Sequence, residues 1–359
     1  MKNLLIQGDN LEALLYLRDK LGMKGKIDLV YIDPPFATGG EFRMDNDGRV
    51  ATISSSAKGA VAYSDKLIGE DFIEFLRKRV AVIYELLSDR GSFYLHIDYK
   101  IGHYVKVMLD EIFGIENFRN DITRVKCNPK NFSRIGYGNI KDMILFYTKG
   151  KNPIWHEPRV SMSEEEIARL YSKIDKNGRR YTTVPIHAPG ETKKGCSSQK
   201  FKGTFPPPGR HWRCSVEELE ELDRRGLIEW SSKGNPRKIN YAEDHLTKKL
   251  QDIWTFKDPV RPIYPTEKNH EMLEMIIKAS SDENSIVMDC FAGSGGTLVE
   301  AERLKRRWIG VDLSETAIAT IRKNLMARCA SFADYGFFRL EGESGKSFGR
   351  HISAGSLRS

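Results

Sequence analysis

A short acidic and proline-rich corner follows a predicted strand near the start of the chain. Asp33-Pro34-Pro35-Phe36 comes directly after the apolar run 27–32, whose β-branched and aromatic residues predict a buried strand. The prolines cannot donate hydrogen bonds to a sheet, and their rings fix φ, so the backbone carbonyls beside them point in set directions. A flat ring carrying an amino group can stack on Phe36 while its NH₂ group donates to the Asp33 carboxylate and the Pro34 carbonyl. The alternative is an ordinary strand end with a proline turn, and four residues alone do not decide between the two.

A glycine-rich turn lies near the other end of the chain. A strand predicted over 285–289 leads into Cys-Phe-Ala-Gly-Ser-Gly-Gly-Thr at 290–297, and a helix over 298–304 precedes a strand over 308–312 that ends in Asp312. This order is typical of a nucleotide-binding βαβ unit, because glycines let the backbone approach a ligand and the acid can bond ribose hydroxyls. The spacing is Gly-x-Gly-Gly, not the Gly-x-Gly-x-x-Gly of dinucleotide-binding proteins, which disfavours NAD.

Together the two motifs resemble those of the β group of DNA amino-methyltransferases. The Phe-Ala-Gly-Ser-Gly turn is similar to the F-x-G-x-G loop of enzymes that use S-adenosylmethionine, and the Asp-Pro-Pro-Phe corner is similar to the motif of enzymes that methylate exocyclic amines of DNA bases. The corner precedes the glycine turn, as in the permuted group that includes the modification subunits of type III restriction systems and several solitary adenine methyltransferases.

The resemblance implies a fold and a reaction. The expected fold is α/β, a doubly wound and mostly parallel sheet of seven strands, one of them antiparallel, and the alternation of predicted strands and helices favours the same class. The expected reaction is methyl transfer from S-adenosylmethionine to the N6 amine of an adenine flipped out of double-stranded DNA. Adenine is preferred because, in this family, an aspartate at the first position of the catalytic motif goes mostly with adenine. Asp33, Pro34, Pro35 and Phe36 are the expected catalytic residues.

The resemblance also assigns a set of cofactor-binding residues. Asp9 matches an acid that meets the adenine amine of the cofactor, with a helix cap as the alternative role. Thr266 and Lys268 match a Pro-Thr-x-Lys segment that completes the pocket, although Asn269 stands where a proline is usual. The full set is Asp9, Asn10, Thr266, Lys268, Asp289, Phe291, Ala292, Gly293, Ser294, Gly295, Asp312 and Ser314.

Composition and charge divide the chain into parts. We expect a catalytic half over 1–150 with a flap loop at 37–66, an insert over 151–252, a cofactor half over 253–335, and a C-terminal segment over 336–359 that ends in a flexible tail. Within 151–250 the basic residues exceed the acidic ones by six, out of a formal net charge of +8 for the chain.

The basic insert is expected to recognise the target, since cations interleaved with aromatic rings can grip phosphates and contact bases. A generic inserted domain with a solvated surface is the alternative, and the acidic helix predicted over 216–222 interrupts the basic character. The residues expected to contact DNA are Lys130, Arg134, Arg210, Trp212, Arg213, Arg237 and Lys238.

Other features of the sequence limit the function classes. No apolar run suits a signal peptide or a membrane span, so we expect a cytoplasmic protein without a membrane partner. The five cysteines include no Cys-x-x-Cys pair, so no metal site is expected. The run His96-Ile97-Asp98-Tyr99 is either an acid–base pair or ordinary polarity at a strand end.

Several alternative functions stay open on the sequence alone. Cytosine N4 in DNA, an amine in RNA and the side-chain amide of a glutamine in a protein can enter the same corner. A nucleotide-dependent oxidoreductase would leave the corner without a role, and a non-catalytic DNA-binding regulator would leave both motifs without one. The expected partner is double-stranded DNA, and a second copy of the chain and a cognate restriction enzyme are further candidates.

Overall fold

The computed structural model describes residues 2–35, 41–44, 60–64, 69–129, 135–192, 195–259, 267–329, 334–340 and 347–352. The chain forms two compact units: unit 1 contains Met1–Pro158 and Gln251–Ser359, and unit 2 contains Arg159–Leu250. The insert expected over 151–252 encloses unit 2 with a few residues on either side.

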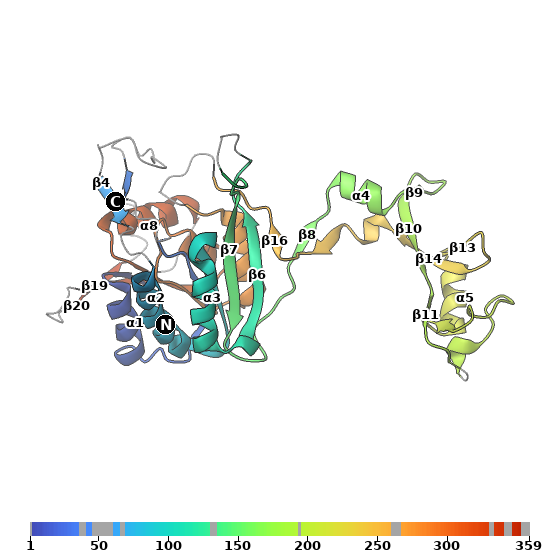
Figure 1. The fold of residues 1–359 in the computed structure, drawn as a ribbon, viewed down its shortest axis with the longest axis horizontal. Coiled ribbons are helices and arrows are strands. Elements are labelled where there is room, and N and C mark those ends of the chain that lie inside the picture. The colour runs from blue at the N-terminus through green and yellow to red at the C-terminus, as the bar shows by residue number, and fades with distance from the viewer. Residues whose placement is uncertain are drawn as a thin grey trace. The chain divides into compact units, whose positions relative to one another are not determined.

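Unit 1 is built on one large sheet (Figure 1). Within the described residues it has ten strands in the order β16-β6-β7-β5-β2-β17-β18-β1-β19-β20. Its strands are β1 (Asn3–Gln7), β2 (Ile27–Ile32), β5 (Leu87–Ile97), β6 (Phe118–Val125), β7 (Lys141–Thr148), β16 (Ile253–Trp254), β17 (Ile286–Asp289), β18 (Arg307–Asp312), β19 (Tyr335–Leu340) and β20 (Ser347–Ile352). Strands β7 and β20 run antiparallel to their neighbours, and the others are parallel.

The mostly parallel α/β sheet is confirmed, with differences at its edges. Among the described residues, the large sheet has ten strands instead of seven, because β16 extends one edge and β19 and β20 extend the other. Two strands are antiparallel instead of one. The flexible tail expected near the C-terminus is wrong for Ser347–Ile352, which pairs with β19 along its whole length.

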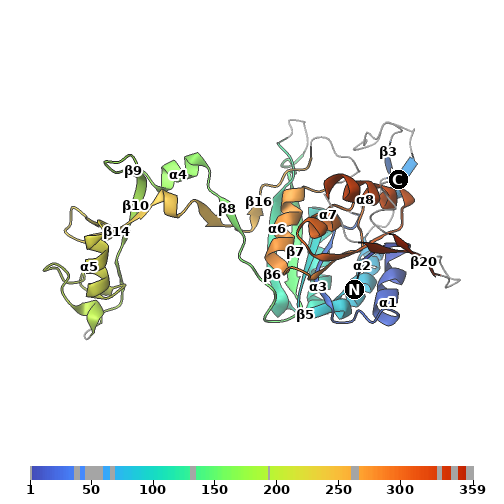
Figure 2. The same ribbon diagram turned by 180° about the vertical axis from the view of Figure 1, so that it is seen from behind.

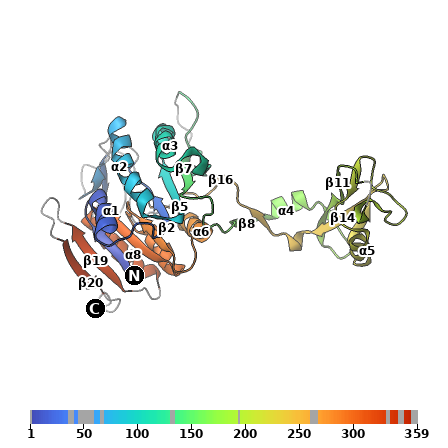
Figure 3. The ribbon, with the colours of Figure 1, turned by 90° about the horizontal axis from the view of Figure 1, so that it is seen from below.

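In the described part of the chain, three helices cover each face of the sheet. Helices α1 (Asn10–Asp19), α2 (Glu70–Leu86) and α3 (Tyr99–Phe113) pack on one face, and α6 (His270–Ser280), α7 (Gly296–Arg303) and α8 (Glu315–Arg328) pack on the other (Figure 2, Figure 3). In α2 the buried residues Phe72, Leu76, Val80 and Ile83 recur at helical spacing, so one stripe of the helix faces the sheet. A 3₁₀ turn at Ile115–Asn117 follows α3.

The expected flap falls mostly outside the described residues. Its two described segments, β3 (Glu41–Met44) and β4 (Ala60–Ser64), pair antiparallel as a separate two-stranded sheet. Among the described helices, none has the length and apolar character needed to cross a bilayer.

Unit 2 contains short elements around a small core. Its elements are β8 (Arg159–Ser161), α4 (Glu164–Leu170), β9 (Lys173–Ile174), β10 (Arg180–Pro185), β11 (His187–Pro189), β12 (Arg210–Trp212), α5 (Val216–Arg224), β13 (Ile228–Trp230), β14 (Pro236–Tyr241) and β15 (Thr247–Lys249), with 3₁₀ turns at Cys196–Ser198 and Ala242–Asp244. Strands β13, β14, β10 and β9 form a sheet, and β11–β12 and β15–β8 form two-stranded ribbons. The core consists of Ile186, Phe201, Trp212, Val216 and Leu219.

Candidate active site

The two sequence motifs lie at the same edge of the unit 1 sheet. Strand β2 pairs in parallel with β17, with Leu29 opposite Val287 and Val30 opposite Met288. Asp33 follows β2 and the glycine turn follows β17, so both begin at the carboxyl ends of adjacent strands. In doubly wound sheets this edge is where ligands bind.

The Asp33 carboxylate has one paired oxygen and one unpaired oxygen. Its Oδ2 lies 3.0 Å from Lys268 Nζ, in an ion pair whose side chains are both largely buried. Its Oδ1 is buried and accepts no hydrogen bond from any described residue, and it lies 4.0 Å from His96 Nδ1. A buried acceptor without a donor costs about 1–3 kcal/mol, so such an atom is a candidate ligand contact. Pro34 is buried beside it, and Phe36 lies outside the described residues.

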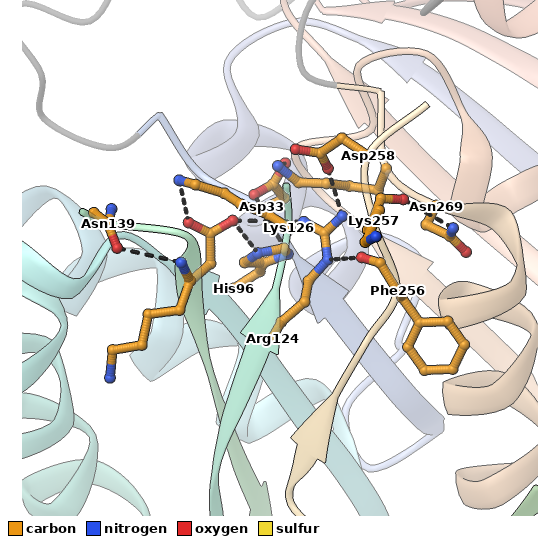
Figure 4. Close-up of polar contacts among 12 residues, drawn as sticks. Asp33, His96, Arg124, Lys126, Asn139, Phe256, Lys257, Asp258 and Asn269 are labelled. Carbon is orange, nitrogen blue, oxygen red and sulfur yellow. Dashed lines mark hydrogen bonds and ion pairs between the residues drawn. The ribbon is translucent and has the colours of Figure 1, made fainter. Parts of the chain in front are cut away.

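Behind Asp33, buried polar side chains from neighbouring strands form a network (Figure 4). His96 on β5 contacts Tyr31 on β2 and Asp142 on β7, and Arg124 on β6 lies 3.5 Å from Asp142. Lys126 donates to the other Asp142 oxygen at 2.6 Å.

Arg124 extends this network toward the segment that follows β16. It donates to the Phe256 carbonyl at 2.8 Å and also pairs with Asp258. Of the two readings of the 96–99 run, strand-end polarity suits Asp98, which caps α3, whereas His96 is fully buried beside Asp33.

The glycine turn is held by the two acids that end its flanking strands. The Phe291 N–H donates to Asp289 Oδ1 at 3.0 Å, and the Thr297 hydroxyl donates to Asp289 Oδ2 at 2.7 Å. The Gly293 N–H donates to Asp312 Oδ2 at 2.8 Å. Burial raises the pKa of the Asp289 carboxyl to about 7. Burial also raises the pKa of Asp312.

Gly295 shows why the turn needs glycine. It has φ +80°, a left-handed conformation, and a Cβ built on it would lie 2.8 Å from Ile321 Cγ1. Ser294 and Ala292 are tied within the turn, since Asn324 donates to the Ser294 carbonyl and the Gly295 N–H donates to the Ala292 carbonyl.

The residues after β1 join the same edge through Arg79. Asp9 Oδ1 accepts from the Leu11 and Glu12 N–H groups and so caps α1, as the alternative role predicted, while its Oδ2 accepts from Arg79 at 3.0 Å. Asn10 donates to the Cys290 carbonyl at 3.0 Å and accepts from Arg79. No sequence signal pointed to Arg79, because it is a buried cation inside a helix.

The Pro-Thr-x-Lys segment is described from Glu267 onward, so Thr266 lies outside the described residues. Lys268 contacts the Asp-Pro-Pro corner through its ion pair with Asp33. Asn269, which replaces the usual proline, caps α6 by accepting from the Met272 N–H at 3.1 Å, and it also donates to the Lys257 carbonyl. The polar residue therefore starts the helix and fixes the turn.

The residues expected to contact DNA have different surroundings. Arg210 and Arg213 are exposed, and Lys238 is half-buried. Arg237 is held by Thr183, through its side chain at 2.9 Å and its carbonyl at 2.6 Å. Trp212 is wrong as a surface contact: it is 1% exposed and forms the centre of the unit 2 core. Lys130 and Arg134 lie outside the described residues.

The residues at this edge fit an adenosine-type cofactor. Asp312 takes one backbone N–H on each oxygen, from Gly293 and from Ser314, which leaves acceptor capacity for ribose hydroxyls. Phe75 and Phe291, with ring centroids 6.2 Å apart, provide aromatic surface for a flat ring. In the described part of the chain, no group of three or more His, Cys, Asp or Glu side chains could hold a metal ion.

The chain is similar in sequence to several known proteins. The model of the N6/N4 methyltransferase family, described as DNA methylase, matches residues 27–323. The type II methyltransferase M.EcaI of Enterobacter cloacae is 40% identical over 342 residues, which cover 93% of this chain and 72% of that protein. The Mod subunit of the type III restriction-modification enzyme EcoP15I of Escherichia coli is 25% identical over 368 residues, which cover 82% of this chain and 55% of the subunit.

The chain spans about half the length of the type III Mod subunits that it matches. Among solved structures, the M1.HpyAVI–SAM complex aligns over 90% of this chain and 98% of its own, with 17% identity and a TM-score of 0.47.

Proposed function

This chain belongs to the family of DNA methylases that act on N6 or N4 amines, with S-adenosylmethionine as the methyl donor, and from that membership we propose that it methylates the N6 amine of an adenine in double-stranded DNA. The observation that carries the proposal is the buried and unpaired Asp33 Oδ1, at the sheet edge shared with the glycine turn. Such an atom is suited to accept a hydrogen bond from an amine that enters the site.

The catalytic corner acts by orienting the amine. The exocyclic nitrogen of adenine is a poor nucleophile because its lone pair is delocalised into the ring. Asp33 Oδ1 and the Pro34 carbonyl accept its two hydrogens, which favours a pyramidal nitrogen whose lone pair faces the cofactor side of the edge. Bound S-adenosylmethionine supplies an electrophilic methyl group. Positioning and electrostatic stabilisation then provide most of the rate, so no cysteine nucleophile is needed.

The bonds and charges balance without a further reagent. The amine nitrogen forms a bond to the methyl carbon while the carbon–sulfur bond breaks, and the electron pair leaves with the sulfur. One amine proton must depart, and Asp33 Oδ1, which already accepts that hydrogen, can take it and return it to solvent. A duplex hides this amine, so the base has to flip out, at a cost of a few kcal/mol.

Cytosine N4 is the second candidate because the family model covers both amines. The preference for adenine rests on the aspartate at the first position of the catalytic motif. Nucleoside analysis of DNA from cells that express the protein decides between them, since it separates N6-methyladenine from N4-methylcytosine. Methylated RNA in the same cells would redirect the proposal to the RNA alternative. Long-read sequencing of that DNA would give the recognition sequence.

The test of the catalytic corner is Asp33→Ala. We expect loss of methyl transfer to genomic DNA in a tritiated-methyl assay, with S-adenosylmethionine binding retained in calorimetry. Asp121→Ala, an exposed acid on β6, is the control for an acid removed from the same sheet. Wild-type turnover by Asp33→Ala would reject the assignment.

Unit 2 is proposed to recognise the DNA target, with the exposed Arg210 and Arg213 as contacts to phosphates. The relatives M.EcaI and the Mod subunit of EcoP15I are named as components of type II and type III systems. By analogy, we propose that this chain also acts in restriction-modification, with a cognate endonuclease as its partner. A homodimer is proposed as well, and sedimentation of the purified chain would test it.

A further inference from the structure

We propose that His96 is a positioning residue for methyl transfer: Asp142 fixes its neutral ring with the proton on Nε2, which keeps Asp33 Oδ1 available to the substrate amine. The inference rests on the proposed function of Asp33 as the amine acceptor. It assigns to His96 and Asp142 an effect on the reaction that does not require either of them to touch the substrate.

The geometry is a row of buried polar groups across three neighbouring strands. His96 on β5 is 0% exposed, and its two ring nitrogens face opposite ways along the row. Nδ1 lies 2.9 Å from the Tyr31 hydroxyl on β2, and Nε2 lies 3.2 Å from Asp142 Oδ2 on β7. Asp33 Oδ1 lies 4.0 Å from Nδ1, on the Tyr31 side of the ring.

The charges around the ring determine which nitrogen carries the proton. Two cations contact the Asp142 carboxylate whatever the state of His96: Lys126 donates to Oδ1 at 2.6 Å, and Arg124 lies 3.5 Å from Oδ2. Burial raises the pKa of Asp142, but the hydrogen bond from His96 and the ammonium groups of Lys268 and Lys126 outweigh it and hold that pKa below its ordinary value. Asp142 is therefore an ionised acceptor, and Nε2 must donate to it.

The other ring nitrogen then has to accept. Burial, followed by the Asp33 charge, raises the pKa of Tyr31 far above its ordinary value, so its hydroxyl stays protonated and donates to Nδ1. Burial and then the Lys268 charge lower the pKa of His96, which keeps the ring neutral. A neutral imidazole has one donor and one acceptor nitrogen, and here both are assigned.

This arrangement explains why Asp33 Oδ1 has no donor although a histidine lies beside it. The nitrogen that faces Asp33 is an acceptor, so it offers no proton to that oxygen. A ring protonated on Nδ1, in the other tautomer or as imidazolium, would present an N–H toward Oδ1 and compete with the substrate amine. The alternative is a buried histidine that serves packing alone, and the experiment must separate the two.

The decisive variant is Asp142→Asn, because an amide NH₂ can donate to Nε2 and move the ring proton to Nδ1. When an amide replaces the carboxylate in a histidine–carboxylate pair of this kind, the side chain keeps its shape but stabilises the other tautomer of the histidine ring. We expect the single-turnover rate of methyl transfer to fall by about 10- to 100-fold, the effect of one charged hydrogen bond, with the Kd for S-adenosylmethionine unchanged.

Two further measurements complete the design. Nitrogen-15 spectra of histidine-labelled protein, with the His96 signal identified by His96→Asn, should show Nε2–H in the wild type and Nδ1–H in Asp142→Asn. Tyr94→Phe is the matched control: Tyr94 lies two residues before His96 on the same strand, is 2% exposed, and bonds Ser280 outside the row. It should keep the wild-type rate.

Each outcome supports or overturns the proposal. A folded Asp142→Asn protein that methylates DNA at the wild-type rate overturns it, and so does a wild-type His96 ring protonated on Nδ1. If Asp142→Asn does not fold, because Lys126 loses the carboxylate that it donates to and Arg124 keeps only Asp258, His96→Asn replaces it. Its amide oxygen can still accept from Tyr31, so it should be faster than His96→Ala, and equal rates overturn the proposal. Asp33→Ala in the same assay tests the proposed function separately, since its full activity would reject that function whatever Asp142→Asn does.

Discussion

Lys268 Nζ lies 3.0 Å from Asp33 Oδ2, so an ammonium group from the segment before α6 holds one oxygen of the catalytic corner after β2. The two residues are far apart in the sequence, and both side chains are largely buried. The sequence assigned Lys268 to the cofactor pocket. In the structure it pairs with Asp33 Oδ2, and Oδ1 is the oxygen that the proposed function assigns to the substrate amine.

Replacing Lys268 should therefore slow the chemical step. We expect Lys268→Met to lower the single-turnover rate of methyl transfer by about 10- to 100-fold, since a hydrogen bond between charged groups contributes about 1.5–3 kcal/mol. Lys278→Met removes an exposed lysine that pairs with Glu274 on α6, and it should leave the rate unchanged. Equal rates for the two variants would show that the ion pair does not serve catalysis.

Gly295→Ala should destabilise unit 1 and weaken cofactor binding. A left-handed alanine costs about 1–2 kcal/mol, and overpacking against Ile321 adds about 1–3 kcal/mol. Gly25→Ala is the control, because Gly25 has φ +70° and a Cβ built on it would meet nothing within 4 Å, so this change carries the conformational cost alone. Urea unfolding and calorimetry with S-adenosylmethionine measure the two effects. Equal losses of stability would contradict the tight contact at Gly295.

Asp289 should make stability depend on pH. The ordinary pKa of this carboxyl is 3.8, and burial raises it to about 7 in the folded protein. Between these two pH values the folded chain keeps a proton that the unfolded chain loses. The wild type should therefore lose stability relative to Asp289→Asn as pH rises through this window, by at most about 4 kcal/mol, and then level off. The unfolding free energies of both proteins should be measured from about pH 4 to pH 8, which covers the shift. If the two curves of free energy against pH were parallel, Asp289 would not be a buried, protonated acid.

Arg210 and Arg213 should contribute to DNA affinity through phosphates. Each change to alanine should weaken binding and reduce the slope of log K against log salt by about 0.9. Arg179→Ala is the control in the same unit, because this guanidinium already pairs with Asp175 and Glu243. Fluorescence anisotropy at several salt concentrations measures the slope. An unchanged slope in the double variant would remove these residues from the proposed DNA surface.

The sequence was sufficient to predict the parts of the site that directly follow apolar strands. Strands β2 and β17 are apolar runs that end in a proline corner and a glycine turn, and adjacent parallel strands place both at one edge. It was insufficient for β6, a strand whose polar sequence includes the fully buried Arg124. A buried charge is compensated by partners on other strands, and periodicity in one segment does not reveal them.

The same limit explains the correction at Trp212. Between Arg210 and Arg213, a tryptophan fits the pattern of a nucleic-acid surface, but it fills the core of unit 2 and donates to the Gln199 carbonyl. A small domain has few large apolar residues, so its aromatic residues are needed inside.

The first and last strands of unit 2 pair with each other. Arg159 lies opposite Lys249, and the Arg159 guanidinium donates hydrogen bonds to the hydroxyl and the carbonyl of Thr247. A segment whose two ends already meet can be exchanged without altering the path of the chain on either side. Residues 159–250 thus enter and leave the chain at one place, so a segment of another length between these ends would leave the strands that hold Asp33 and the glycine turn unchanged.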